Sequence, residues 1–183
     1  MATTVRLRPA TLDCEPVLQR LWQLYRHDLS EYRDSYPDET GRFKDGRLPD
    51  YFDDPDRLAY LVDVHLGEPD ATSSRPPGQP WQLAGFALVR GLAAGPRLMG
   101  EFFVVRSVRR LGVGRAAAKA LLAAHPGQWW IPFQEENPQA ARFWRQVAAE
   151  VARDAWREEL RPVVGKPWIP PDVWLELPAV VPN

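Results

Sequence analysis

The stretch Glu101–Arg115, EFFVVRSVRRLGVGR, decides the fold of this 183-residue chain. Its first part, Phe102–Val105, is a β-branched and aromatic run, which is the composition of a buried strand. A short basic turn with two glycines follows. The next segment, Arg115–Ala124, contains strong helix formers and no helix breaker. The stretch therefore predicts a strand, a tight turn and the start of a helix.

The predicted turn is suited to an anion. The first N–H groups of a helix have no partners inside the helix, and the helix dipole adds positive potential there. Glycine residues let a phosphate approach the backbone closely. Cationic side chains also gather at this point, although the formal net charge of the chain is only −1. These side chains are Arg106, Arg109, Arg110, Arg115 and Lys119. We expect a pyrophosphate at this helix start; a turn that merely caps the helix is the alternative.

Two motifs point to a family. The run Arg109–Gly114 (RRLGVG) resembles the Arg/Gln-x-x-Gly-x-Gly/Ala loop of the GCN5-related N-acetyltransferases (GNAT superfamily), which holds the pyrophosphate of acetyl-coenzyme A. The run Asn137–Trp144 (NPQAARFW) resembles the downstream helix of that family, Asn-x-x-Ala-x-x-Phe-Tyr, and one strand-like run separates the two motifs. The resemblance implies these cofactor-binding residues: Val104, Val105, Arg109, Arg110, Leu111, Gly112, Val113, Gly114, Arg115, Asn137, Ala140 and Phe143.

The resemblance also implies an architecture. The family has an α/β fold with a mixed, mostly antiparallel, twisted sheet of about six to seven strands, flanked by about four helices and splayed between the fourth and fifth strands. Pro132 in the fifth strand cannot donate a ladder hydrogen bond, which is compatible with splaying. Residues 1–183 read as one domain, in which Gly67–Pro80 is a flexible loop insertion.

The residue pattern places the elements of this fold. A first helix, capped by Thr11 or Asp13, is expected to run to about Arg26, and the helical signal resumes through Tyr32 and Tyr36. Further helices are expected at Gly112–Ala124 and Asn137–Glu150. The predicted strands are Thr3–Arg8, Leu58–Leu66, Trp81–Arg90, Leu98–Val105, Gln128–Gln134, Val151–Leu160 and Val173–Leu177.

The implied reaction is transfer of an acetyl group from acetyl-coenzyme A to a primary amine of a small molecule or peptide, by direct attack in a ternary complex. An amine of the lysine type has a pKa of about 10.4 and must lose a proton before it attacks. Glu101 is the candidate general base, acting through a water molecule. Alternatively, Glu101 is a solvated strand-edge carboxylate or a partner of Arg97 or Arg106. Glu135 and Glu136 are weaker candidates.

Other roles follow from the family pattern. The oxyanion donor is expected to be a backbone N–H near Val104 or Val105. The elements between the first two strands line the acceptor side in the family, so His27, Glu31 and Tyr32 are candidate substrate-binding residues, beside Asp28. Packing of helices on the sheet is the simpler explanation for this region. The acidic segment 34–56 has two interpretations: it attracts a cationic acceptor, or it is a solvated loop without such a role.

One position departs from the family pattern. Many members place a tyrosine after the phenylalanine of the downstream helix, where it protonates the leaving thiolate. Here that residue is Trp144, which has no acidic hydroxyl. Water or Tyr32 then serves as the acid, or the thiolate leaves without one. The alternatives on the same fold are a non-catalytic acyl-coenzyme A-binding or sensor module and a transferase with a longer acyl donor.

Composition narrows the class of protein further. A net charge of −1 argues against general nucleic-acid binding. No apolar run approaches the length of a membrane span, and the single cysteine, Cys14, is what we expect of a reducing cytoplasm. No metal is expected, and no Gly-Lys-Ser/Thr motif of a nucleotide hydrolase follows the loop. The family resemblance is compatible with a homodimer.

Overall fold

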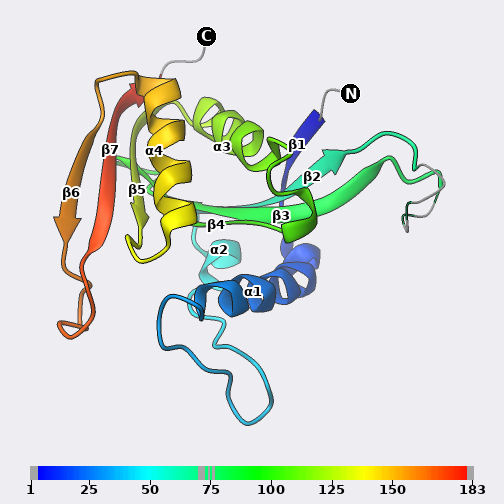
Figure 1. The fold of residues 1–183 in the computed structure, drawn as a ribbon, viewed down its shortest axis with the longest axis horizontal. Coiled ribbons are helices and arrows are strands. Elements are labelled where there is room, and N and C mark those ends of the chain that lie inside the picture. Colours follow the sequence, from blue (N-terminus) through cyan, green and yellow to red (C-terminus); the bar gives the residue numbers. More distant parts are fainter. Residues whose placement is uncertain (1–3, 70–72, 74, 76, 181–183) are drawn as a thin grey trace.

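A computed structural model describes residues 4–69, 73, 75 and 77–180 (Figure 1). Within these residues the chain forms a seven-stranded sheet in the order β1-β2-β3-β4-β5-β7-β6. The strands are β1 (Thr4–Pro9), β2 (Arg57–His65), β3 (Trp81–Arg90), β4 (Arg97–Val104), β5 (Gly127–Phe133), β6 (Arg157–Arg161) and β7 (Asp172–Val180). The helices are α1 (Glu15–Leu29), α2 (Asp50–Asp53), α3 (Val113–Ala124) and α4 (Pro138–Ala152), with 3₁₀ turns at Leu12–Cys14 and Arg106–Val108.

The sheet confirms the expected mixed and mostly antiparallel architecture. Only the β4–β5 pair is parallel. These two strands pair at only two positions, Arg97 with Trp129 and Leu98 with Trp130. Beyond them the strands diverge, and in Figure 1 β5, β7 and β6 stand at a steep angle to β2, β3 and β4. The expected splay between the fourth and fifth strands is therefore present.

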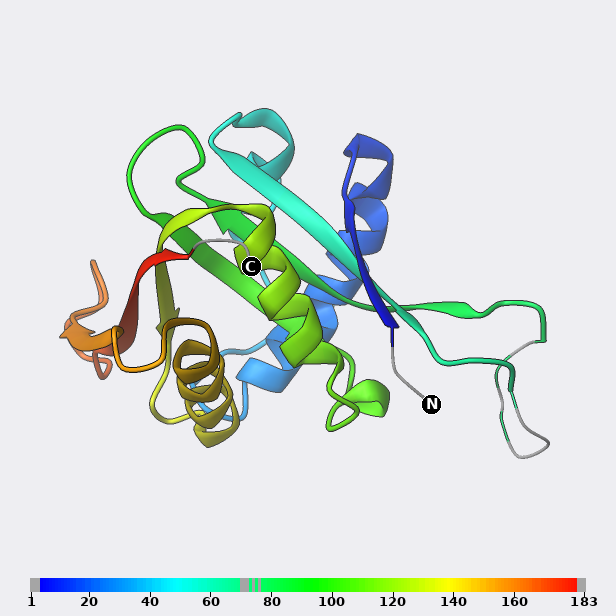
Figure 2. The same ribbon diagram turned by 90° about the horizontal axis from the view of Figure 1, so that it is seen from above.

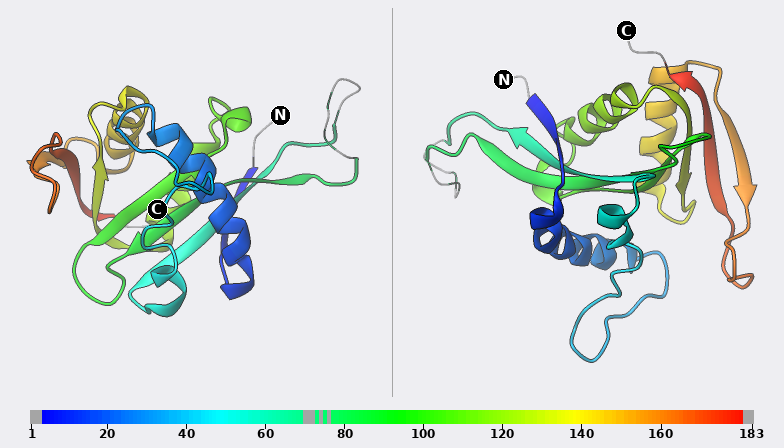
Figure 3. Two further views of the ribbon diagram at one scale, coloured as in Figure 1. Left: turned by 90° about the horizontal axis from the view of Figure 1, so that it is seen from below. Right: turned by 180° about the vertical axis from the view of Figure 1, so that it is seen from behind.

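Helices cover both faces of the sheet. Figures 1 and 2 show α3 and α4 on one face, and the view from below in Figure 3 shows α1 and α2 across the other. Leu121 of α3 and Trp144 of α4 join Trp129 in the first core. Leu18 and Trp22 of α1 pack in the second core, with strand residues such as Phe86 and Phe103. Because each face is covered, the splayed edge lies between the two helical layers.

Local chemistry explains the elements that border the splay. Asn137 is the N-cap of α4, and its side chain accepts a hydrogen bond from the Ala140 N–H at 3.0 Å, as predicted. In β4 the register shifts between Leu88 and Val89 of the neighbouring strand, which pair with Glu101 and Met99. Gly100 is thus the extra residue of a β-bulge, a feature that changes the direction of the following side chain.

Three expectations about the elements are wrong: a resumed helix, a helix cap and the start of a strand. Helical structure does not resume through Tyr32 and Tyr36: the chain leaves α1 after Leu29, and Tyr36 is 80% exposed. With no apolar face to bury, spacing alone does not hold a helix. α1 begins at Glu15 and no side chain caps it. The predicted strand Val151–Leu160 is also wrong at its start, because Val151 extends α4 and packs on the core.

Two further expectations concern regions described only in part. The predicted insertion Gly67–Pro80 includes residues outside the described ones; its ends are joined by a hydrogen bond from the Leu66 N–H to the Pro80 carbonyl at 3.3 Å. Thr3, the first residue of the first predicted strand, also lies outside the described part. Among the helices that are described, none combines the length and apolar character needed to cross a membrane.

Candidate active site

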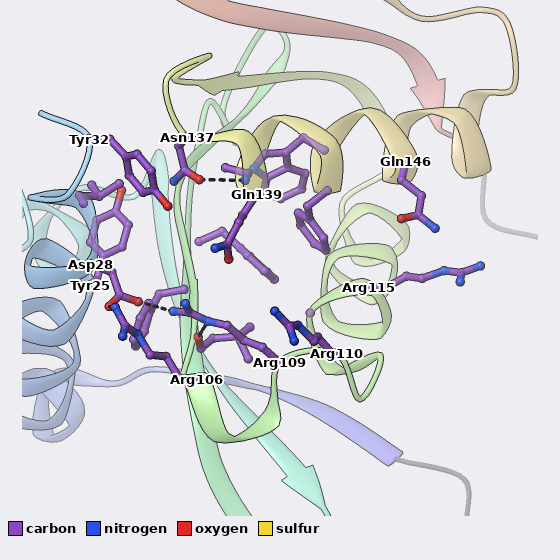
Figure 4. A pocket seen from close by; sticks show the side chains of 18 of the residues that line it. Tyr25, Asp28, Tyr32, Arg106, Arg109, Arg110, Arg115, Asn137, Gln139 and Gln146 are labelled. Atoms are coloured by element: carbon purple, nitrogen blue, oxygen red, sulfur yellow. Dashed lines mark hydrogen bonds and ion pairs between the residues drawn. The ribbon is translucent and has the colours of Figure 1, made fainter.

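A large cavity opens beside the splayed strands. It has a volume of about 950 Å³ and lies between the C-terminal end of α1, the loop from β4 to α3, and α4 (Figure 4). Four arginines line it: Arg106, Arg109, Arg110 and Arg115. Gly112 and Gly114 face it from the start of α3. The basic turn predicted to hold an anion therefore forms one wall of this cavity.

The glycine loop exposes backbone to this cavity. Gly112 precedes α3 with φ of 79°, in the left-handed region that favours glycine. A Cβ atom added there would meet no atom within 4 Å, so this backbone faces open space. Val113 is buried and anchors the helix start in the core. The N–H groups of the first turn of α3 have no partners within the helix and are available to an anion.

Asp28 of α1 connects to two of the arginines. Its carboxylate accepts hydrogen bonds from Arg106 at 2.8 Å and from Arg109, and Figure 4 shows the three side chains meeting at the edge of the cavity. Burial opposes ionisation of Asp28, but the hydrogen bonds from Arg109 and Arg106 outweigh it and lower its pKa. Arg109 also donates to the Val104 carbonyl at 2.8 Å. Asp28 therefore fixes both guanidinium groups against the end of β4.

The other two arginines differ. Arg115 is paired with Glu150 of α4 at 2.7 Å, on the outer side of the cavity. Arg110 is exposed and makes no ion pair with any residue in the described part of the chain. Its backbone is left-handed, with φ of 66°, a conformation that is uncommon for a residue other than glycine. Arg110 therefore supplies a positive charge that no carboxylate of the described residues neutralises.

The free edge of β4 presents backbone donors to the splay. Val105 donates its N–H to the Ala84 carbonyl at 2.8 Å, which fixes the hydrogen-bonding alternation of the antiparallel β3–β4 pair. By this alternation the N–H groups of Phe102 and Val104 point away from β3, toward the diverging β5. The expectation of an oxyanion donor at Val105 is therefore wrong, because that N–H is already used; Val104 stays a candidate.

A smaller cleft of about 210 Å³ adjoins the large cavity, and Tyr25, Phe102 and Trp144 border both. Glu101 lines the cleft and accepts a hydrogen bond from the Tyr25 hydroxyl. Burial raises the pKa of Glu101 to about 7, although the Tyr25 hydrogen bond acts in the opposite direction. Burial and the nearby Glu101 raise the pKa of Tyr25 well above its usual range. Glu101 is thus a carboxylate that changes protonation near neutral pH.

Aromatic side chains form the wall between the two spaces. Trp144 is only 6% exposed. Its ring lies 5.2 Å from the Phe102 ring and 4.8 Å from the Phe143 ring, measured between centroids. Trp144 therefore occupies the family's tyrosine position as a packed apolar wall.

Most of the predicted site residues line the large cavity, but some do not. Of the predicted cofactor-binding residues, Val105, Leu111 and Val113 do not line the cavity; Leu111 is 51% exposed. Glu31 and Tyr32 line the large cavity, whereas exposed His27 borders neither space. The remaining predicted cofactor-binding residues all line the large cavity: Val104, Arg109, Arg110, Gly112, Gly114, Arg115, Asn137, Ala140 and Phe143.

The carboxylates offered as alternatives have other partners. Glu101 pairs with neither Arg97 nor Arg106, since Arg106 binds Asp28 and Arg97 donates to the Gly95 carbonyl at 3.1 Å. Glu135 is bound by Arg145 at 2.7 Å, and Glu136 by Arg33 at 3.3 Å. Among the described residues, no three His, Cys, Asp or Glu side chains are grouped so that they could hold a metal ion.

Sequence reasoning missed several residues of the site. Tyr25 lies within the first predicted helix without being singled out as a site residue, yet its hydroxyl binds Glu101. Tyr25 and Asp28 are three residues apart on α1, so they lie on one helix face, and this spacing was the available signal. Gln134 and Asp172, which line the smaller cleft, carried no local signal.

Neither a protein-family model nor a curated protein matches the sequence. Solved structures do match. NAA60 from Arabidopsis thaliana in complex with acetyl-CoA is 13% identical, with a TM-score of 0.59 over 97% of this chain and 99% of that one. Spermidine N-acetyltransferase from Vibrio cholerae in complex with CoA and spermine is 14% identical, with a TM-score of 0.59 over 96% and 95%. A GNAT-family acetyltransferase from Staphylococcus aureus is 10% identical, with a TM-score of 0.56 over 96% and 99%.

Proposed function

We propose that this chain, which has the fold of the GCN5-related N-acetyltransferases, is an acetyl-coenzyme A-dependent N-acetyltransferase that acts on a primary amine in a ternary complex. One observation carries the proposal: a basic cavity with a glycine-lined helix start adjoins a cleft that holds a carboxylate of pKa about 7. The solved structures of similar fold that hold acetyl-CoA, or CoA and spermine, support it.

The residues of the large cavity fit the cosubstrate. Its pyrophosphate would lie against the open backbone at Gly112 and Gly114, where helix N–H groups and the dipole favour anions. Arg110 adds a guanidinium without a carboxylate partner in the described residues. The N–H groups of Phe102 and Val104 offer donors along the free strand edge. Acetyl-coenzyme A supplies a thioester whose carbonyl carbon an amine attacks, forming a C–N bond and releasing a thiol.

Glu101 accepts the proton that the amine loses. A base works best when its pKa lies near the operating pH, and burial brings Glu101 to about 7. Tyr25 holds the carboxylate through its hydroxyl, so Tyr25 is a positioning residue for Glu101. The backbone N–H of Val104 or Phe102 is the candidate donor to the developing oxyanion.

Trp144 has no hydroxyl to protonate the leaving sulfur, and two other hydroxyls are candidates for that role. Tyr25 and Tyr32 both line the large cavity. Tyr25 also contacts Glu101, which receives the amine proton, so a proton passed from Glu101 to Tyr25 would regenerate both groups after Tyr25 donates its own. Tyr25 therefore replaces Tyr32 as the favoured acid in the proposal.

One observation favours a second function. Trp144 fills the family's tyrosine position with a buried ring that has no hydroxyl, as expected of a coenzyme A-binding or sensor module without catalysis. The raised pKa of Glu101 is not needed by such a module, so we rank it second.

Titration of acetyl-coenzyme A into the purified protein by calorimetry, followed by assay of thiol release with a panel of primary amines, tests both functions. Binding with thiol release is the expected result. Binding without release with any amine would favour the sensor module. Absence of binding would overturn both proposals and reduce the loop at Gly112 to a helix-capping turn.

A further inference from the structure

The charged side chains that line the smaller cleft are all acidic. Glu101, Gln134 and Asp172 contribute side chains to it, and no lysine, arginine or histidine of the described residues lines it. The adjoining large cavity is lined by four arginines. The cleft is therefore suited to a cation, as the cavity is suited to an anion.

Gln134 offers a hydrogen-bond acceptor that nothing uses. It follows the last residue of β5, and its side-chain oxygen Oε1 is buried without a partner among the described residues. Leaving a buried acceptor unpaired is unfavourable, so such groups usually have a partner in the working molecule. A ligand N–H in the cleft would satisfy this oxygen.

Both carboxylates of the cleft have raised pKa values, in each case mainly because of burial. The charge of Asp172 adds to the effect on Glu101, whereas the charges of Arg26 and Arg90 oppose it. Asp172 is held from one side by Arg33 at 3.0 Å, and Arg33 does not line the cleft. Arg33 also binds Glu136, so one guanidinium serves two carboxylates. The cations that act on these carboxylates, Arg26, Arg33 and Arg90, all lie outside the cleft lining, so the cleft itself presents only acidic charges.

The lining of the cleft favours a positively charged ligand and disfavours one that also carries a carboxylate. An ammonium group would be attracted by Glu101 and Asp172 and would donate to Gln134 Oε1. A carboxylate on the adjacent carbon, as in an amino acid, would lie against the same two groups with no cation of the described lining to receive it. Phe133 and Trp144 supply apolar walls for the rest of the molecule.

We propose that the smaller cleft binds a compact primary ammonium compound that carries no carboxylate, with its N–H groups donated to Gln134 Oε1 and Asp172 and with Glu101 beside the reacting nitrogen. Ligand binding in the cleft is independent of the proposed transferase function; only the acetyl transfer that follows binding rests on it. The cleft volume of about 210 Å³ suits a small monoamine. Gln134 and Asp172 are thus specificity-determining residues.

Matched pairs of ligands test the proposal. Phenethylamine is compared with phenylalanine, and 3-methylbutylamine with leucine, because each pair differs only by the carboxylate. Binding is measured by calorimetry with the protein saturated in coenzyme A, and again without it, and kcat/KM is measured by thiol release. We expect each amine to exceed its amino acid by at least about 10-fold, or about 1.4 kcal/mol. Equal values, or a preference for the amino acid, would overturn the proposal.

Variants separate the cleft from the cavity. Gln134→Leu should raise KM for the amine several-fold and leave the affinity for acetyl-coenzyme A unchanged. Gln128→Leu, the same substitution at an exposed position of β5 that lines neither space, is the control and should change neither. Asp172→Asn should reduce the preference for the amine over its amino acid, because it removes one repelling charge and leaves Arg33 with Glu136 as its only carboxylate partner among the described residues. Unaltered KM in Gln134→Leu, or an unaltered preference in Asp172→Asn, would contradict the assigned roles.

The experiments distinguish failure of the cleft assignment from failure of the transferase proposal. If no amine releases thiol but coenzyme A-independent titration still shows the preference for amines, the cleft assignment stands and the transferase proposal falls. If thiol release occurs with amino acids as readily as with amines, the transferase proposal stands and the cleft assignment falls.

Discussion

The large cavity and the smaller cleft are built in different ways. The basic wall of the cavity comes from one continuous stretch, residues 104–115, and α4 supplies the opposite wall. The cleft takes Tyr25 from α1, Glu101 from the β4 bulge, Gln134 from the end of β5 and Asp172 from the start of β7. A site made by one turn is visible in a sequence, whereas a site made where four elements meet becomes visible only in the fold.

The two spaces also differ in charge, and α1 serves both. Asp28 faces the arginines of the cavity, while Tyr25 faces Glu101 in the cleft. An anionic cosubstrate and a cationic acceptor would therefore be sorted into adjacent spaces by electrostatics alone. The contrast predicts that variants on one side change one ligand only, and the following four experiments test that separation.

The largest effect is expected from Glu101→Gln. Removing the base should lower kcat by about 100- to 10,000-fold, because general base catalysis typically contributes that much, and leave the affinity for acetyl-coenzyme A unchanged. Steady-state kinetics and calorimetry measure the two quantities. Glu135→Gln is the matched control, since Glu135 is bound to Arg145 outside both spaces and should keep full activity. A Glu101→Gln protein with normal kcat would remove Glu101 from the mechanism.

Gly112→Val should act on the cavity alone. A side chain there would project into the open space of the loop, and we expect the affinity for acetyl-coenzyme A to fall by at least about 10-fold, or 1.4 kcal/mol. Gly41→Val controls for backbone strain, because Gly41 has nearly the same φ of 77° with equally open surroundings and lies outside both spaces. Equal affinity in both folded variants would show that the loop does not hold the pyrophosphate.

The pH profile should report the raised pKa of Glu101. A base must be ionised, so its contribution is complete above a pKa of about 7 and is lost as the pH falls through that value. Activity at pH 6 should be about one-tenth of the plateau from this group. Dividing the kcat/KM profile of the native protein by that of Glu101→Gln removes the titration of the amine itself. A flat ratio between pH 5 and 8 would be incompatible with Glu101 as the base.

Tyr25→Phe should have the smallest effect on ligand affinity, but it should lower kcat, because the favoured acid is lost, and change the titration of Glu101. The Tyr25 hydrogen bond lowers the pKa of Glu101, so its loss should move the acid limb of kcat/KM to higher pH. Tyr32→Phe is the matched control, because Tyr32 lines only the large cavity and should leave that limb in place. The same shift in both variants, or in neither, would refute a specific role for the Tyr25 hydroxyl.

The sequence predicted most of the sheet, because strands such as Trp81–Arg90 carry a strong β pattern between clear turns. It also predicted the cap of α4, because Asn137 and Pro138 form a local signal. It failed at Tyr32 and Tyr36, where the spacing suits a helix but the structure buries no face of it. It failed at Val105, since the direction of an N–H depends on the register with β3, which no single strand contains.

The junction of β4 with β5 has a consequence for motion. Two residue pairs join the first four strands to the last three, while side chains on both parts, such as Met99 and Leu175, share one apolar core. The two parts of the sheet are therefore coupled by packing more than by main-chain hydrogen bonds. We expect amide hydrogen exchange to reveal two separately opening units, which a ligand bridging both would merge into one.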